Sequence, residues 1–210
     1  MKVRILSKTP EGVCELAAST CTASKNPEKA LAHSVASGHT SVLEHMNFTF
    51  DVTGISRAAL AQVTRHRLAS FSVKSQRYVR IGTDDLVIPE SLKRHPEFAD
   101  RVKQLMWDTM DLYQEMVDAG VPKEDARYIT PQAVTTDLVM TMNARELLHF
   151  FELRCCNRAQ WEIRELADEM LRLCRAEAPE IFKHAGPGCV TGRCPEMKPC
   201  GHPRDESDWD

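Results

Sequence analysis

Apolar and polar residues alternate along two stretches of the chain, which is the pattern of a half-buried β-strand. In residues 46–53 every second side chain is apolar, and Gly54 is expected to end the strand. Residues 134–142 are rich in β-branched residues and methionine, which also indicates a strand. Shorter extended segments are predicted at residues 2–6 and 71–81.

Helical spacing and capping residues predict that most of the remaining chain is helical. Asn26-Pro27-Glu28 supplies an N-cap, a proline at the first helical position and an acid in the first turn. Asn143 and Glu146 form a variant of the capping box. Helices are predicted at residues 12–23, 27–38, 58–67, 97–119, 143–154 and 160–178, with a short one after Pro122 that carries Arg127.

These elements predict an α+β fold, in which helices pack around a small, mostly antiparallel sheet. Residues 1–186 are expected to form a single catalytic domain. Residues 187–210 are rich in Gly, Pro, Cys and charge, which is typical of a loosely structured tail. The tail has few apolar residues, so we expect it to add nothing to the core.

Composition narrows the class of protein. The 210 residues carry a formal net charge of -3, so no general attraction to nucleic acid is expected. No apolar run approaches the roughly 20 residues of a membrane span, and the first residues lack the apolar core of a signal peptide. A cytoplasmic location without a membrane partner is therefore predicted. In that reducing compartment the eight cysteines are not expected to form a disulfide framework.

One segment gathers cations in this slightly acidic chain. Arg65, Arg67, Lys74, Arg77 and Arg80 are interleaved with serine, glutamine and tyrosine. Guanidinium groups bind phosphate oxygens in pairs, and hydroxyls add further donors. Three interpretations fit this composition: a site for a phosphate-bearing small ligand, an RNA-binding surface, or ordinary helix-end cations followed by a solvated strand.

The spacing within this segment is more specific than its composition. Arg65-His66-Arg67, then Ser75 and directly Gln76-Arg77-Tyr78, resembles the signature of the flavin-dependent thymidylate synthases, the ThyX family. Other segments resemble the same family in the same order over roughly residues 1 to 185. They are Gly38-His39-Thr40-Ser41-Val42-Leu43-Glu44-His45, Phe48 and Phe50, Ser56-Arg57 with Gln62, Gly120-Val121-Pro122, Ala126-Arg127, Asn143-Ala144-Arg145, Arg154, and Ala159-Gln160-Trp161-Glu162-Ile163.

The resemblance implies an enzyme that reductively methylates dUMP to dTMP. It implies methylenetetrahydrofolate as carbon donor and NADPH as reductant acting through FAD, with no protein nucleophile. It also implies a homotetramer whose active sites are shared between subunits. The absence of a Gly-x-Gly-x-x-Gly or P-loop motif agrees with flavin binding by arginines, amides and helix ends.

The resemblance also implies roles for individual residues. Arg154 would be the catalytic residue, because a fixed cation can stabilise negative charge that develops on the uracil. The dUMP-binding residues would be Gln62, Arg65, Ser75, Gln76, Arg77, Arg127 and Arg154. The FAD-binding residues would be Ser41, Arg65, His66, Arg67, Asn143, Arg145 and His149. His39 and Tyr78 would lie in the folate and nicotinamide region.

Two positions depart from the family's common pattern. Val73 stands where many members have glutamate, so one polar contact to flavin or substrate would be absent or replaced. His149 stands where some have asparagine; both can hydrogen-bond a flavin, but only histidine titrates near neutral pH.

The predicted helix from Asn143 to Arg154 places its two arginines on opposite sides. Arg145 and His149 share one edge, whereas Arg154 lies almost opposite Arg145. One helix can hardly present both arginines to the same small ligand. The two are therefore expected to serve different sites, or one site shared between subunits.

Several remaining residues admit a plainer interpretation. His39, Glu44 and His45 could bind a metal ion, but they lack a third spaced ligand. Cys189, Cys194, Cys200 and His202 are candidates for a structural zinc site, and thus for a noncatalytic zinc-stabilised module; the alternative is free thiols in a tail. Cys155-Cys156, Met106, Met110, Met116, Trp107 and Trp161 are expected to pack in the interior.

Overall fold

A four-stranded antiparallel sheet forms the frame of the molecule, which confirms the predicted α+β class. A computed structural model describes residues 1–82, 86–192 and 194–209. The strands are β1 (Lys2–Lys8), β2 (Asn47–Ser56), β3 (Ala69–Val73) and β4 (Thr135–Asn143), in the spatial order β1-β2-β4-β3. No helix among the described residues is both long and apolar enough to cross a membrane.

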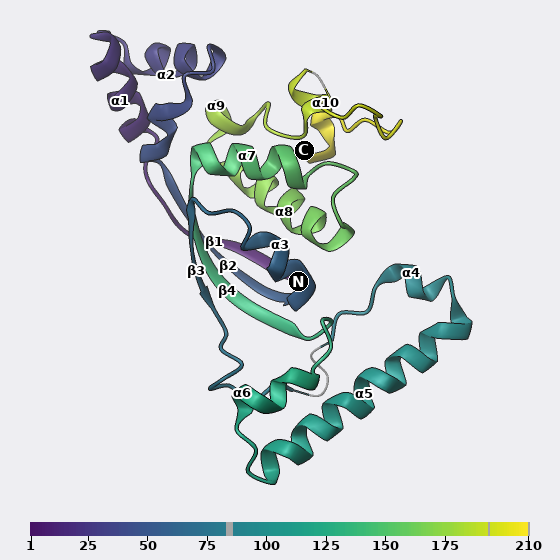
Figure 1. Ribbon diagram of the computed structural model, residues 1–210. Coiled ribbons are helices and arrows are strands. Elements are labelled where there is room, and N and C mark those ends of the chain that lie inside the picture. The colour runs from purple at the N-terminus through teal and green to yellow at the C-terminus, as the bar shows by residue number, and fades with distance from the viewer. Residues whose placement is uncertain (83–85, 193, 210) are drawn as a thin grey trace.

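Helices cover one face of this sheet (Figure 1). Alternation in β2 turns Phe48, Phe50 and Val52 inward, where they are fully buried. They pack with α7 (Ala144–Arg154), α8 (Trp161–Glu177) and α9 (Pro179–Phe182) in one continuous core. The opposite face of the sheet carries polar side chains, such as the hydrogen-bonded pair Thr49 and Thr141.

Local signals in the sequence explain where the flanking helices begin. The Asn26 side chain accepts a hydrogen bond from Lys29 N at 3.0 Å and starts α2 (Pro27–Ala36). Ser56 likewise caps α3 (Arg57–Val63) through Ala59 N at 3.0 Å. The remaining elements on this side are α1 (Gly12–Thr22) and the 3-10 helix η1 (Thr40–His45).

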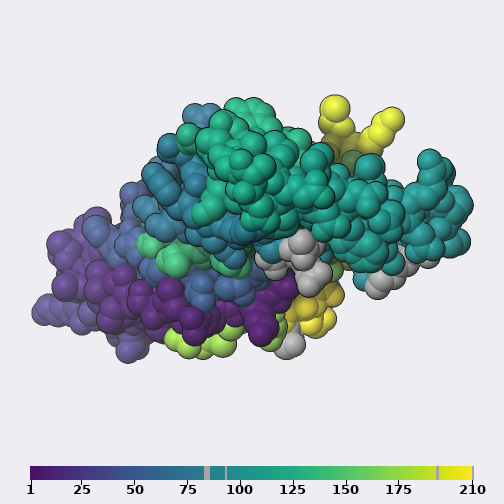
Figure 2. Space-filling view, turned by 90° about the horizontal axis from the view of Figure 1, so that it is seen from below, coloured from purple at the N-terminus to yellow at the C-terminus, as the bar shows by residue number. Residues whose placement is uncertain are grey.

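A second unit extends from the sheet as a helical arm. It comprises α4 (Glu90–Lys93), α5 (Pro96–Asp118), α6 (Lys123–Ala126) and the 3-10 helix η2 (Arg127–Ile129). Met110 and Tyr113 are buried in a small separate cluster at its base. The arm forms a ridge in the view from below and projects beyond the rest of the chain (Figure 2).

The structure differs from the sequence prediction at three backbone positions. Gly54 does not end β2, because its positive φ of 75° accommodates an irregularity in register and the strand continues to Ser56. The extended segment predicted over residues 71–81 ends at Val73, since Val79 N bonds Ser75 O at 2.9 Å and closes a turn. Helix α3 ends at Val63 rather than at residue 67.

Only some of the side chains that were predicted to pack in the interior are buried. Cys155 and Met110 are fully buried, as expected. Trp107, expected to pack inside, is 47% exposed on α5. A heptad-spaced apolar stripe, Phe98, Leu105 and Leu112, also lies exposed on that helix. These side chains find no core within the single chain because the arm stands away from the sheet.

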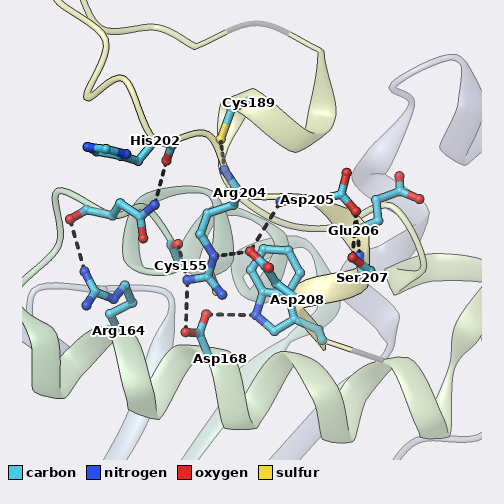
Figure 3. Close-up of polar contacts among 12 residues, drawn as sticks. Cys155, Arg164, Asp168, Cys189, His202, Arg204, Asp205, Glu206, Ser207 and Asp208 are labelled. Carbon is cyan, nitrogen blue, oxygen red and sulfur yellow. Dashed lines mark hydrogen bonds and ion pairs between the residues drawn. The ribbon is translucent and has the colours of Figure 1, made fainter.

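The C-terminal segment is not a loosely structured tail. It forms the short helix α10 (Gly188–Thr191) and the 3-10 helix η3 (Glu206–Trp209). Trp209 is 3% exposed and belongs to the main core, while Arg204 bonds Asp168 of α8 at 3.1 Å (Figure 3). The expectation that this segment adds nothing to the core is therefore wrong. The boundary between residues 186 and 187 stays a prediction.

Candidate active site

The N-terminal part of the candidate site lies where η1 packs against α7. His39 and Ser41 are exposed at the start of η1. The Arg145 guanidinium forms an ion pair with Glu44 of η1. Asn143 uses its side-chain oxygen to cap α7, accepting from Glu146 N at 2.8 Å. The predicted residues His39, Ser41, Asn143 and Arg145 thus lie at the N-terminal end of α7, and Arg145 points to η1.

A buried carboxylate positions the helix that precedes the Arg-His-Arg segment. Glu162 of α8 is 4% exposed and accepts hydrogen bonds from both Ser56 N at 2.6 Å and Ser56 Oγ at 2.5 Å. These bonds hold the start of α3 against α8. Gln62, near the end of α3, and Arg65 are thereby placed beside the C-terminal end of α7.

Along one face of α7, from its first turn to its last residue, three polar side chains form a chain of hydrogen bonds. His66 Nδ1 lies 2.9 Å from Glu146 Oε1, and Arg154 Nε donates to His66 Nε2 at 3.1 Å. An Arg154 terminal nitrogen also approaches Gln62 O at 3.5 Å. Burial lowers the pKa of Arg154, with a further contribution from the positive charge of Arg65. Arg154 therefore sits in a partly desolvated position next to the signature segment, where a ligand charge would be felt strongly.

Arg57 was not among the predicted ligand-binding residues, although it lies in a cationic cavity with two that were. A cavity of about 390 Å³ is lined by Arg57, Gln76 and Arg127 among others. Burial, and then the charge of Arg127, lowers the pKa of Arg57. Within the part of the chain that the structure describes, Arg57 has no ion-pair partner. Its place in the Ser56-Arg57 motif was the only signal available in the sequence.

Arg77 and Tyr78 face a different cavity, of about 430 Å³, formed with the start of the arm. Arg77 Nε bonds Glu124 Oε2 at 2.6 Å. The Tyr78 ring is 74% exposed, and its carbonyl accepts a bond from Lys123 at 2.9 Å. Ser75 directly precedes Gln76 in the chain, and its hydroxyl accepts from Arg77 N at 3.2 Å.

Within one chain, these residues therefore form separate groups. The structure brings His66 and Arg154 together, and likewise Gln76 and Arg127. It places Arg145 with Glu44 and Arg77 with Glu124. Arg145 and Arg154 thus contact different partners, as the helical wheel indicated.

The exposed donors suit a flavin dinucleotide. Arg65 and Arg67 are exposed and, among residues 1–82, 86–192 and 194–209, neither has a carboxylate partner. These two guanidinium groups flank His66 in the chain, and the exposed His149 ring lies 5.8 Å from the His66 ring, so that the segment offers donors for a diphosphate and a flavin ring. Val73, where many family members have glutamate, is a partly buried apolar residue packed on the core.

The candidate metal ligands receive no support from the geometry. No group of three or more His, Cys, Asp or Glu residues in the described regions is arranged to hold a metal ion. Cys189, Cys194, Cys200 and His202 instead line parts of one cavity of about 420 Å³, together with Arg154. His39, Glu44 and His45 likewise form no metal cluster.

Arginines without carboxylate partners on an α+β frame are the donors that a phosphorylated ligand would accept. Residues 4–180 match the family model described as thymidylate synthase complementing protein. A flavin-dependent thymidylate synthase of Geobacter sulfurreducens is 50% identical, with 93% of this chain and 91% of the relative covered. One of Pyrococcus furiosus is 47% identical, with coverage of 80% and 73%.

Solved structures agree with the sequence relatives. The ThyX of Helicobacter pylori in complex with FAD and dUMP superimposes with a TM-score of 0.74 at 27% identity, covering 89% of this chain and all of the other. This chain belongs to the flavin-dependent thymidylate synthase family.

Proposed function

We propose that this chain is a subunit of a flavin-dependent thymidylate synthase, which converts dUMP to dTMP with FAD as bound cofactor. The observation that carries this conclusion is the half-buried Arg154 hydrogen-bonded to His66, next to Arg65 and Arg67, which lack carboxylate partners in the described part of the chain. NADPH as reductant and methylenetetrahydrofolate as carbon donor complete the proposal, and cytoplasm is the expected location. The comparisons give no support to an RNA-binding alternative.

We further propose that the dUMP phosphate binds in the cavity of Arg57, Gln76 and Arg127. Two guanidinium groups lie close enough for one to lower the pKa of the other. Such mutual repulsion is relieved when a dianionic phosphate lies between the two cations. Ser75 and Arg77, on the adjoining turn, would contact the same nucleotide.

Arg154 would then act on the base of the nucleotide. A guanidinium directed at the uracil stabilises negative charge at N3 and the neighbouring carbonyl, and more so in a site that excludes water. The bound flavin would supply the hydride chemistry. Ser75 would bind ligand without forming a covalent bond, since no base lies within hydrogen-bond distance of its hydroxyl in the described residues.

FAD would be held by Ser41, Arg65, His66, Arg67, Asn143, Arg145 and His149, with His39 and Tyr78 in the folate and nicotinamide region. In one chain these residues lie in separate groups, which supports a site completed by neighbouring subunits. The stripe of Phe98, Leu105 and Leu112 on α5 supports the same idea. Its heptad spacing suits packing against a helix of a second copy in a homotetramer.

Flavin spectroscopy tests the proposed function. The purified protein should be yellow or take up FAD, and anaerobic NADPH should bleach the flavin faster when dUMP is present. Addition of methylenetetrahydrofolate should then yield dTMP. Arg57→Ala should raise the dUMP concentration needed for half-maximal bleaching, whereas Arg94→Ala, far along the arm, should not. Protein that binds no FAD even with dUMP present would refute the proposal.

A further inference from the structure

Three side chains from two distant parts of the sequence meet in the interior beside the candidate site. His66 follows α3 and is 4% exposed, and Glu146 is 7% exposed in the first turn of α7. Arg154 is the last residue of α7. Residues 146, 150 and 154 recur at intervals of four and so share one face of α7. The His66 ring lies along that face.

The hydrogen-bond donors in this group can be assigned without ambiguity. Arginine Nε can only donate, so the His66 Nε2 atom that it contacts at 3.1 Å must be unprotonated. The proton of a neutral imidazole is then on Nδ1, which donates to Glu146 Oε1 at 2.9 Å. Burial lowers the pKa of His66, and the charge of Arg154 adds to this, against the opposing effect of Glu146. The neutral ring is thus the form that this geometry requires.

Packing fixes the imidazole plane as well. The Phe150 ring lies edge-on to it, with ring centroids 4.8 Å apart and an angle of 70° between the planes. His149 lies on the neighbouring side at 5.8 Å. Glu146 itself cannot shift easily, because its backbone is tied to the N-cap Asn143. The acceptor that His66 offers to Arg154 is therefore held in one direction.

Because the acceptor, His66, is neutral, it orients Arg154 without neutralising its charge. A carboxylate in direct contact would orient the guanidinium equally well but would neutralise much of its field. Here the contacts of Arg154 are an imidazole nitrogen and a backbone carbonyl. In the described part of the chain no carboxylate pairs with it. The cation is oriented while its charge remains available to a ligand.

We propose that His66 is a positioning residue for Arg154: Glu146 holds its Nδ1–H tautomer, and its Nε2 fixes the direction of the guanidinium. The inference rests on the proposed function only in that Arg154 acts on the nucleotide. It assigns to the imidazole nitrogens a task within the chain, so that a contact between His66 and FAD would be made by other atoms.

Two variants of His66 distinguish its effect on the orientation of Arg154 from its effect on packing in the interior. Glutamine can both donate to Glu146 and accept from Arg154, whereas leucine fills the space without either bond. In FAD-loaded enzyme, His66→Leu should lower kcat by about 10²-fold, the scale of a misplaced catalytic group. His66→Gln should recover most of kcat when the variants are compared at equal bound FAD. Wild-type kcat in folded, FAD-loaded His66→Leu would overturn the proposal.

The pH profile gives a second readout that a purely structural role would not change. Protonated His66 cannot accept from Arg154, so kcat should fall on the acid side as His66 titrates under the influence of Glu146, Arg154 and His149, while the charge of Arg65 acts on Arg154. His66→Gln should lose this acid limb. The control His95→Gln, an exposed histidine on the arm, should keep it. An unchanged acid limb in His66→Gln would contradict the inference.

Nitrogen NMR of enzyme labelled at histidine tests the tautomer without any activity measurement. The signals missing from His66→Gln identify His66, and they should show a protonated Nδ1 and an unprotonated Nε2 at neutral pH. An Nε2-protonated or charged ring would overturn the proposal. In Glu146→Ala, the Nδ1–H tautomer of His66 should no longer be fixed, and the same NMR experiment can measure this without any turnover. Failure of the wild type to form dTMP would therefore refute the proposed function but not the role of His66.

Discussion

Replacement of Trp209 by alanine should strongly destabilise the protein, although the residue belongs to a segment rich in polar side chains. Its ring is buried in the main core, with the Arg204 and Arg175 guanidinium carbons 4.5 and 5.1 Å from the ring centroid. Removal of a buried tryptophan side chain costs about 3–5 kcal/mol. Its Nε1 also donates to Asp168 Oδ1 at 2.8 Å. Trp209→Phe, which loses this bond but keeps most of the packing, should cost about 1 kcal/mol.

Urea denaturation followed by far-ultraviolet circular dichroism measures these costs. All variants should be compared at one protein concentration, because subunit association adds to apparent stability. Met197→Ala is the matched control, since Met197 lies in the same segment and is fully exposed; it should change the unfolding free energy by less than about 0.5 kcal/mol. Hydrogen exchange of α8 amides would show whether the segment detaches before the core unfolds.

Unfolding of Trp209→Ala at the same urea concentration as the wild type would show that the buried ring does not stabilise the core. A chain ended at Gly186 provides the stronger test, because it also removes Arg204 and its bonds to Asp168 and the Cys155 carbonyl. It should be less stable than Trp209→Ala. Equal stability of the truncated chain and the full chain would mean that residues 187–210 only rest on the surface.

Three further predictions concern the site. Arg154→Ala should retain its fold but lose about 10²–10³ in turnover, and Arg154→Lys should not restore it because an ammonium lacks the planar fork; steady-state dTMP formation measures this, and wild-type rates would exclude Arg154 from the reaction. Ser75→Ala should weaken dUMP binding by about 0.5–1.5 kcal/mol in calorimetry yet retain turnover, and a nucleotide attached to Ser75 in a mass spectrum would contradict this. The unfolding free energy should decrease as pH falls below about 6.5, because the unfolded chain protonates His66 before the folded chain, whose His66 pKa is lowered, does. Denaturation at several pH values should show a smaller decrease in His66→Gln; an equal decrease would argue against this assignment.

Local signals in the sequence were sufficient for the elements and for the family. Asn26, Ser56 and Asn143 cap the helices that they were expected to begin or precede, because capping involves only neighbouring residues. Alternation in β2 correctly separated the buried phenylalanines from the exposed face, since the strand repeat is set by backbone geometry. The order of the Arg-His-Arg, Ser75 and Arg154 motifs along the chain indicated the enzyme class.

Contacts between residues far apart in the sequence were decided only by tertiary structure. Nothing local distinguishes Arg154, held by a histidine 88 positions away, from Arg77, which pairs with Glu124. A glycine such as Gly54 can either end a strand or accommodate a bulge within it, and the neighbouring residues do not distinguish the two. The pairing of β2 with β4 on both sides of Gly54 determines that the strand continues. Trp209 is a single large apolar residue in a polar segment, so no periodic pattern predicted its burial. Its ring is nevertheless buried between α8 and Gly186. Packing density and charge pairing depend on three-dimensional neighbours, which no pattern along one segment contains.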